Sequence, residues 1–464
     1  MQTLTDQVTT LDGLVWQPFA MPLVLVIVGL LITIRTGFVQ VRQFPLAVRR
    51  TLGSAVAKSG AASGEGAITS FQALSTALAS TVGNGNIGGV ATAILIGGPG
   101  AIFWMWVTAA VGMATKYAEA VLGVRYRVTR ETGELASGPM YYITRGVPHA
   151  ATGRALAGMF AFFGAATALF GTGNMAQSNT VARTFTEAAR DLTGLDVPVL
   201  VPGLLISTAV GLVLLGGIRR IAAVAERLVP SMIVLYVTAA LAYVVLNAAQ
   251  IPAVLGQVVA GALQPAAAFG GFVGASVAQV IAAGVSRGVL SNEAGMGSAP
   301  IAHGIARVKH PSEQGVIGIF EVFMDTIVVC SMTAFIILTS GLWTEPAYQG
   351  ASGDLTAAAL GTAIPFASLI VALCSFLFGF STLIGWAYYG EKCIEFLFGS
   401  SVIQAYRVVF TVMVLVGAVV SVPLVWAIGT LLNGFMAFPN LIGIAFLVGT
   451  VRSLTLDYFA SRST

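Results

Sequence analysis

Hydrophobic residues gather in about eleven stretches of the chain, each long enough to cross a bilayer as a helix. Short polar loops separate these stretches and hold most of the charged residues. The pattern predicts an all-α integral membrane protein with about eleven transmembrane helices. The expected spans are approximately 18–34, 72–96, 100–123, 155–182, 198–216, 229–248, 255–286, 314–341, 360–390, 402–425 and 430–451.

The composition supports this reading. Only 9% of the 464 residues are charged and 56% are hydrophobic, whereas a soluble domain carries about 25% charged residues. The cysteines, Cys330, Cys374 and Cys393, lie in or beside apolar stretches without ligand spacing. We therefore expect no disulfide framework. The histidines fall in expected loops, which argues against a histidine-based metal site.

Basic residues predict the orientation, because cytoplasmic loops collect arginine and lysine. An odd number of spans places the two termini on opposite sides of the membrane. With the N-terminus outside, the outer loops hold few basic residues, Arg183 and Arg190. The inner loops then hold Arg35, Arg42, Arg49, Arg50, Lys58, Arg125, Arg127, Arg130, Arg145, Arg154, Arg219, Arg220, Arg307 and Lys309. We expect a bacterial inner-membrane protein with its N-terminus outside and its C-terminus in the cytoplasm.

The segment 35–70 is polar and basic, and it ends in a stretch rich in Gly, Ala and Ser. It is too short to bury an independent core, so a separate catalytic domain is not expected. We interpret it as a surface linker or an amphipathic helix on the inner leaflet.

The stretch Ser80–Gly89, STVGNGNIGG, interrupts an expected membrane span with glycine and asparagine. Unwound backbone at membrane depth persists only where protein, water or a ligand satisfies its polar groups. The stretch predicts two half-helices, 72–82 and 87–96, whose facing ends attract an anionic group and a cation. A close helix contact through Gly85 and Gly89 explains the glycines equally well.

A second glycine-rich interruption favours the half-helix interpretation. Gly270, Gly271 and Gly274 lie inside the apolar run 265–286. With the first span set aside as an extra helix, each of two five-helix repeats then begins with a discontinuous helix. Transporters built from inverted repeats show this arrangement. The units are an N-terminal helix and basic segment (1–70), a first repeat (71–250) and a second repeat (251–464).

Several blocks of the chain resemble the alanine or glycine:cation symporter family, also called the sodium:alanine symporter family. The resemblance runs from about residue 70 to 450. The blocks are TALASTVGNGNIGGVATAI (76–94), GGPGAIFWMWVTAAVG (97–112), ATKYAEAVLGVRYR (114–127), GPMYYI (138–143), GVSRGVLSNEAGMGSAPIAH (284–303) and STLIGWAYYGEKC (381–393). The resemblance implies a leucine-transporter-like fold of the amino acid-polyamine-organocation superfamily, with an extra N-terminal helix. It also implies transport of small neutral amino acids with Na⁺ or, less often, H⁺.

The resemblance implies a binding site for a zwitterion, whose two charged groups each need a partner. We expect the carboxylate on the amides of Asn84, Gly85 and Asn86, although threonine is frequent in the family at the position of Asn84. The ammonium group would face carbonyls of the 270–274 break, including Gly274, and polar groups of the fourth span.

Polar and aromatic side chains would complete this site. Asn174, Gln177 and Ser178 lie within the expected fourth span, where interhelical hydrogen bonding is the alternative role. The resemblance favours Gln177 as a ligand. It also places Thr382 and Trp386, one turn apart on the ninth span, beside the substrate side chain. Phe272 would close another side. Ordinary packing is the alternative for Trp386.

The same resemblance implies a Na⁺ site made of neutral, hard oxygen ligands. It lies between the first break and the ninth span. Its expected ligands are the carbonyls of Ala79, Val82 and Phe378 and the hydroxyls of Ser381 and Thr382. Thr382 would then contact both ion and substrate, which would couple their binding.

Four other ionisable residues need an explanation. Glu321 and Asp325 lie one turn apart on the eighth span, where a charge costs about 2.5–3.5 kcal/mol. Asp325 is a protonation site, an ion ligand or a structural hydrogen-bond acceptor. Arg287 and Glu293 follow the seventh span on the inner side, where they pair across a cytoplasmic gate or are solvated loop charges.

The sequence therefore predicts a secondary symporter that imports alanine and glycine with Na⁺ by alternating access. Coupling to H⁺ or a broader neutral amino acid range is the alternative. A membrane enzyme is not expected, because no H-E-x-x-H or G-x-S-x-G motif is present. A channel is less favoured, because channels more often repeat a filter by oligomeric symmetry.

Overall fold

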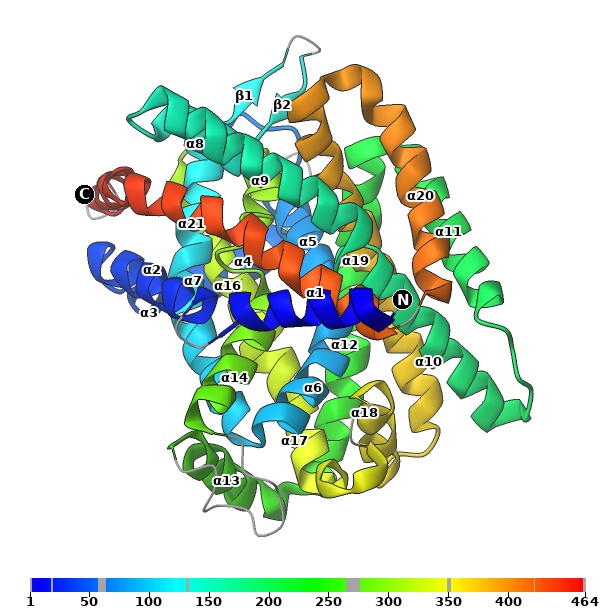
Figure 1. Ribbon diagram of the computed structural model, residues 1–464. Coiled ribbons are helices and arrows are strands. Elements are labelled where there is room, and N and C mark those ends of the chain that lie inside the picture. Colours follow the sequence, from blue (N-terminus) through cyan, green and yellow to red (C-terminus); the bar gives the residue numbers. More distant parts are fainter. Residues whose placement is uncertain are drawn as a thin grey trace.

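The computed structural model describes residues 2–17, 20–56, 64–130, 133–263, 276–348, 352–420 and 422–461. The described chain is mostly helical, and long helices cross one another around a buried centre (Figure 1).

The first half of the chain forms twelve α-helices and one short antiparallel strand pair. The helices are α1 (Gln2–Val15), α2 (Met21–Arg35), α3 (Val39–Arg42), α4 (Phe44–Val56), α5 (Ser70–Thr81), α6 (Gly88–Gly97), α7 (Gly100–Arg125), α8 (Pro139–Gly146), α9 (Ala150–Phe170), α10 (Met175–Thr193), α11 (Leu200–Leu214) and α12 (Gly217–Leu246). Strands β1 (Val128–Thr129) and β2 (Leu135–Ala136) follow α7.

The second half continues with further helices, one of which contains a π-helical stretch. They are α13 (Ile251–Leu263), α14 (Val277–Asn292), α15 (Ala299–His303), α16 (Pro311–Val322), the π-helix η4 (Phe323–Cys330), α17 (Ser331–Ser340), α18 (Ser352–Gly361), α19 (Ala367–Phe398), α20 (Ile403–Val419) and α21 (Val422–Ala460). Single 3₁₀ turns are η2 (Asn84–Asn86), η3 (Ala248–Gln250), η5 (Leu342–Thr344), η6 (Pro346–Tyr348) and η7 (Ser400–Val402).

The helices have the lengths and surfaces of membrane spans. Within the described chain, six helical stretches are long and apolar enough to cross a membrane: Ala150–Thr193, Gly217–Leu246, Pro311–Ser340, Ala367–Phe398, Ser400–Val419 and Leu424–Ala460. The peripheral helix α11 leaves Leu205 and Leu212 largely exposed. Such an apolar outer surface suits a lipid environment and would be costly in water.

The helices that carry the predicted site lie near the centre of the molecule. Helix α5 packs on α12, α16 and α19, and α14 packs on α6 and α7, while α11 and α20 lie at one edge (Figure 1). Helix α5 starts at a capping box, in which Thr69 accepts from the Gln72 amide and the Gln72 side chain accepts from the Thr69 amide. A capping box at Ser276 starts α14 in the same way.

The fourth expected span differs from the observed helices. It was predicted as continuous over 155–182 and is divided into α9 and α10 by the non-helical residues 171–174. The seventh, predicted over 255–286 with a break at 270–274, corresponds to helices α13 and α14, and residues 264–275 between them lie outside the described chain. The N-terminal helix α1, which precedes the first expected span, was not predicted. It packs along α21, and the Trp16 indole donates to the Thr430 carbonyl at 3.0 Å.

The segment 35–70 is partly helical and contains α3 and α4. Helix α4 packs on α16 and buries Ala47 completely, while Arg50 forms an ion pair with Glu313 at 3.4 Å. This agrees with an amphipathic helix. The predicted glycine-rich end of the segment falls partly on residues 57–63, outside the described chain.

Candidate functional site

The first helix break lies where the sequence predicts it, between α5 and α6. Side chains from other parts of the chain bond its exposed backbone. The Gly83 amide donates to Asn86 Oδ1 at 2.9 Å, and the Asn84 amide donates to Gln177 Oε1 at 3.1 Å. Thr333 Oγ1 donates to the Asn86 carbonyl at 2.7 Å. The break is therefore a structured, buried loop whose backbone groups are largely bonded within the protein, as buried unwound backbone requires.

A second break among the described residues follows α14, at residues 293–298. It was not predicted, and the predicted break at 270–274 lies outside the described residues. Gly295 and Gly297 have positive φ angles of 91° and 82°, a conformation that glycine adopts without steric cost. The Gly297 amide donates to Glu119 Oε1 at 2.9 Å, and Asn440 Nδ2 donates to the Gly295 carbonyl at 2.8 Å. The stretch after α14, expected to be an inner loop, is thus a buried helix interruption.

A third break separates α9 from α10 and was not predicted. Two glycines and an asparagine within residues 171–174 supply its sequence signal. Gly173 lies directly against Trp386, because a Cβ added at Gly173 would be 2.6 Å from the Trp386 ring. The break places Gln177 in the first turn of α10, where its side chain reaches the Asn84 amide.

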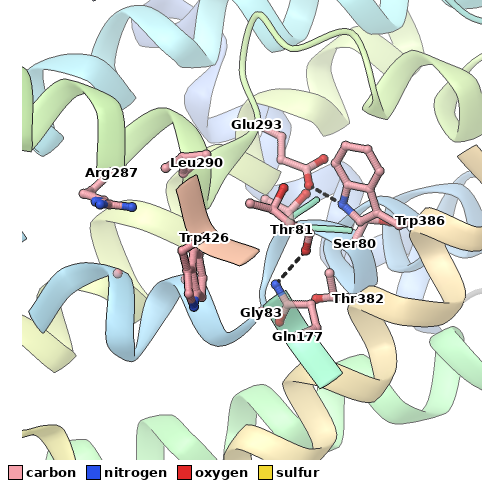
Figure 2. Close-up of a pocket in the computed structure, with 13 residues that line it drawn as sticks. Ser80, Thr81, Gly83, Gln177, Arg287, Leu290, Glu293, Thr382, Trp386 and Trp426 are labelled. Carbon is pink, nitrogen blue, oxygen red and sulfur yellow. Dashed lines mark hydrogen bonds between the residues drawn. The ribbon is translucent and has the colours of Figure 1, made fainter. Parts of the chain in front are cut away.

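These breaks and α19 surround one cavity (Figure 2). It contains about 410 Å³ of empty space, counted to its open end. Its lining residues are Ser80, Thr81, Gly83, Gly85, Gly89, Thr172, Gln177, Arg287, Leu290, Glu293, Thr382, Trp386 and Trp426.

The structure brings together about half of the predicted substrate residues. Gly85, Gln177, Thr382 and Trp386 line the cavity. Phe272 and Gly274 lie outside the described residues. Asn174 and Ser178 are buried away from the cavity: Asn174 Nδ2 donates to the Phe410 carbonyl at 3.0 Å, and Ser178 Oγ to the Met175 carbonyl at 3.2 Å.

The two asparagines of the first break make structural hydrogen bonds with their side chains. Asn84 Oδ1 accepts from Ser375 Oγ at 2.7 Å. Asn86 Nδ2 donates to Asp325 Oδ1 at 2.7 Å and to Ser291 Oγ at 2.9 Å. Both side chains are fully buried. Asn84 Nδ2 has no hydrogen-bond partner among the described residues, and neither asparagine lines the cavity.

Not every backbone amide of the break is available in this conformation. The Asn84 amide is bonded to Gln177, and the Asn86 amide donates to the Gly83 carbonyl at 3.0 Å. Among the described residues no partner is recorded for the Gly85 amide, and Gly85 lines the cavity. A carboxylate could bind Gly85 directly, whereas Asn84 becomes available only if Gln177 turns away.

Trp386 forms one wall of the cavity. Its indole Nε1 donates to Glu293 Oε1 at 2.8 Å, and its ring packs edge-on against Tyr389 at a centroid distance of 5.7 Å. Figure 2 shows Trp386 and Glu293 turned toward each other beside Ser80 and Thr81. Trp386 is 1% exposed, and this bonding fixes the orientation of its ring.

The predicted cation ligands are buried together beside the first break. Ala79, Val82, Phe378 and Ser381 are fully buried, and Thr382 is 2% exposed. Ser381 Oγ donates to the Phe378 carbonyl at 2.9 Å, so these two groups bond each other. A Cβ added at Gly83 would be 2.6 Å from Thr382 Oγ1. The Thr382 hydroxyl therefore lies against the backbone of the break.

Thr382 Oγ1 has no hydrogen-bond partner among the residues that the structure describes. A buried hydroxyl without a partner costs about 1–3 kcal/mol. A cation or a polar ligand group would remove this cost. The described residues hold no cluster of three His, Cys, Asp or Glu side chains suited to a metal ion. Neutral oxygens are thus what this site offers to an ion.

A buried ionic network lies next to the first break and was not predicted. Lys116 Nζ bonds Glu321 Oε1 at 3.0 Å, and His303 Nε2 bonds Glu321 Oε2 at 2.6 Å. Thr81, the last residue of α5, donates to Glu321 Oε1 at 3.1 Å. His303, expected in a loop, is fully buried at the end of α15. Lys116 within an apolar span was the available signal, because charges there are rare.

Asp325 has a separate environment from Glu321, although the two lie one turn apart. It lies in the π-helix and is fully buried. Its carboxylate accepts from Asn86 at 2.7 Å, Ser291 at 2.8 Å and Thr326 at 2.8 Å. These contacts agree with the structural-acceptor interpretation. The Asp325 carboxylate links Asn86 of the first break to Ser291 in the last turn of α14.

The fold and the site define the class of protein. A polar cavity among interrupted helices within a bundle of apolar helices is the arrangement of a secondary transporter, and such transporters are not enzymes. The solved structure of MhsT in complex with L-phenylalanine is similar, with a TM-score of 0.56 at 13% identity. The similarity covers 84% of this chain and 99% of the MhsT chain. At this identity it shows a shared leucine-transporter-like fold.

The family follows from the sequence comparisons. A model of the sodium:alanine symporter family matches residues 1–464. The sodium/alanine symporter AgcS of Methanococcus maripaludis is 44% identical, over 97% of this chain and 96% of AgcS. The probable sodium/glutamine symporter GlnT of Bacillus subtilis is 38% identical, over 99% of this chain and 91% of GlnT. The chain belongs to the sodium:alanine symporter family, which confirms the resemblance found in its motifs.

Proposed function

We propose that this protein imports small neutral amino acids, alanine and glycine first among them, together with Na⁺. The observation that carries the proposal is the cavity between the breaks. It combines the amide of Gly85 and the hydroxyl of Thr382, which have no partner among the described residues, with the wall formed by Trp386. The cavity therefore offers groups for an anionic end, a cation and a small side chain.

In this proposal the substrate carboxylate binds at the N-terminal end of α6, the helix that follows the first break. The Gly85 amide and the N-terminal end of α6 favour an anion there. If Gln177 turns to the substrate, it releases the Asn84 amide as a second donor. Trp386 fills the space beyond the α-carbon, so that a hydrogen or a methyl group is accommodated and a larger side chain is not.

Na⁺ binds between α5 and α19. The carbonyls of Ala79 and Val82 come from the end of α5, and Thr382 supplies a hydroxyl that needs a partner. Ser381 completes the site by turning its hydroxyl away from the Phe378 carbonyl, which frees that carbonyl as a further ligand. An uncharged oxygen set suits a weakly held monovalent ion.

The same proposal includes the membrane architecture of the protein and the energy source of transport. We infer about eleven spans, with α2 as the extra helix before two inverted five-helix repeats. The N-terminus lies outside, as the distribution of basic residues favours. One Na⁺ that enters down 100 mV contributes about 2.3 kcal/mol. This supports roughly fifty-fold accumulation of a neutral zwitterion, since tenfold requires about 1.4 kcal/mol.

Uptake by proteoliposomes tests this function. Labelled alanine is supplied under an inward Na⁺ gradient, an inward H⁺ gradient, both or neither. We expect accumulation several-fold above equilibrium with the Na⁺ gradient and inhibition by unlabelled glycine. Accumulation driven by the H⁺ gradient alone would instead support proton coupling. Equal uptake under all four conditions would contradict a symporter.

A further inference from the structure

One carboxylate in the cavity wall has so far been given only the role of accepting from Trp386. Glu293 lines the cavity and is 3% exposed. It stands at the start of the second break, one position after the end of α14. We propose that Glu293 is the group that binds the substrate ammonium. This inference rests on the proposed transport of amino acids and adds a specificity-determining residue to it.

The hydrogen bonds of Glu293 leave acceptor capacity for a ligand. Oε1 accepts from Trp386 Nε1 at 2.8 Å, and Oε2 accepts from Ser298 Oγ at 2.5 Å. An ionised carboxylate has about four acceptor positions, so each oxygen retains one. The two donors hold the carboxylate in place at the cavity wall. An ammonium group with three donors can bind to the remaining positions.

The charge of Glu293 lacks a counter-ion in the described part of the chain. No ion pair to its carboxylate occurs there within 4.0 Å. The buried Lys116 ammonium is bonded to Glu321 instead. Arg287 also lines the cavity, but Figure 2 shows its side chain apart from Glu293, beyond Leu290. A buried carboxylate is costly unless it is paired. The substrate ammonium supplies this pairing whenever the site is filled.

The backbone of Glu293 places the carboxylate at the cavity. Its φ angle of 55° is left-handed, a conformation that glycine usually provides after the end of a helix. Here a residue with a charged side chain occupies that position instead. The left-handed turn leads the chain out of α14 while the side chain stays against Trp386. A glycine would make this turn without strain but would leave the cavity without an anionic group.

The charges of the cavity then match those of a zwitterion. The Gly85 amide and the N-terminal end of α6 favour the carboxylate, while Glu293, just after the end of α14, supplies an anionic group to the same cavity. The alternative is that Glu293 only accepts the Trp386 indole and so fixes the ring. The two roles predict different responses to a substrate that lacks the ammonium group.

Binding of alanine and L-lactate separates these roles. Lactate has nearly the size of alanine but carries a hydroxyl in place of the ammonium. Labelled alanine and competing lactate are titrated, in Na⁺ buffer, against the full-length protein and its Glu293→Gln variant. Glutamine retains the shape and can still accept from Trp386. We expect alanine affinity to fall at least tenfold in Glu293→Gln, and the preference for alanine over lactate to fall at least tenfold as well.

Further variants keep the result interpretable. Trp386→Phe removes the indole donor and leaves Glu293 charged, so we expect it to retain the alanine preference. Glu395→Gln alters a buried carboxylate that is paired with Lys392 on α19 at 2.8 Å and does not line the cavity; we expect it to leave the preference unchanged. Should Glu293→Gln fail to fold, Glu293→Asp retains the charge at a shorter reach. We then expect weaker alanine binding with the preference over lactate intact.

Two results would overturn the inference. One is wild-type alanine affinity in a folded Glu293→Gln variant. The other is a parallel loss of alanine and lactate affinity with their ratio unchanged, which would indicate that Glu293 only positions Trp386. Failure of the wild-type protein to bind any amino acid in Na⁺ would instead contradict the proposed function itself.

Discussion

At the scale of residues, the cavity depends on close contacts that only small side chains permit. Gly83 lies against Thr382, and Gly173 lies against the face of Trp386. Neither glycine has a positive φ angle, so the space beside them, rather than a special backbone conformation, requires glycine. These positions fix where the threonine and the tryptophan lie relative to the breaks.

The contact between Gly173 and Trp386 yields a test with a matched control. A Cβ at Gly173 would be 2.6 Å from the ring, whereas a Cβ at Gly158 in α9 would meet nothing within 4 Å. We expect Gly173→Ala to displace Trp386 and weaken alanine binding at least tenfold. Gly158→Ala should leave binding unchanged and stabilise the protein by up to about 1 kcal/mol. Titration of both variants with alanine measures the two affinities. Unchanged affinity in Gly173→Ala would show that Trp386 does not form a wall of the binding site.

Part of the residue-level site could be predicted from the sequence. The resemblance implied Gln177, Thr382 and Trp386, and all three line the cavity. The role of the Asn84 and Asn86 side chains could not be predicted, because their partners come from distant helices. Glu293 was predicted to lie in an inner loop rather than at the cavity, for a similar reason. Its surroundings, Trp386 and Ser298, are brought together only by folding.

At the scale of elements, the interrupted helices depend on polar groups supplied by neighbouring helices. Glu119 on α7 and Asn440 on α21 bond the second break, and Lys116 on α7 bonds Glu321 beside the end of α5. Hydrophobic periodicity predicts where a helix lies but gives no information on which other helix satisfies its break. Asparagine and glycine in an apolar run therefore indicated the first break correctly. The breaks after α14 and between α9 and α10 were not predicted, and the predicted break at 270–274 lies outside the described residues.

The Lys116–Glu321 pair tests whether this network supports the fold. Both side chains are fully buried, and loss of one partner of a buried pair costs about 3–5 kcal/mol, because the other charge stays uncompensated. We expect Lys116→Met to lower the midpoint of thermal unfolding clearly in detergent. The exposed pair between Arg190 and Asp196 provides the control, since its side chains are 72% and 80% exposed. Arg190→Ala should change stability by less than about 1 kcal/mol. Equal midpoints for the two variants would show that the buried network is dispensable.

At the scale of the whole molecule, the chain is a member of a transporter family with a leucine-transporter-like fold. Its class, its helical content and its membrane character could all be predicted, because composition and long apolar runs determine them. Helix α1 could not be predicted as a packed element, since it is short and polar and gains its contacts from α21. The match over the full chain, and over nearly all of AgcS, assigns the whole protein to this family.

The central claim is that the same site binds an amino acid and Na⁺, with Thr382 between them. Reciprocal coupling requires that Na⁺ tighten alanine binding whenever alanine tightens Na⁺ binding. Thr382→Val removes the unpartnered hydroxyl at nearly constant shape. Thr167→Val is a matched control, because Thr167 Oγ1 is also buried and lacks a partner among the described residues, but it does not line the cavity.

The most direct measurement is the dissociation constant of alanine for the purified protein in Na⁺ buffer and in choline buffer of equal ionic strength. We predict at least tenfold tighter binding in Na⁺ for the wild type and for Thr167→Val, and a loss of most of this difference in Thr382→Val. The same dissociation constant in Na⁺ and choline for the wild-type protein would contradict the account.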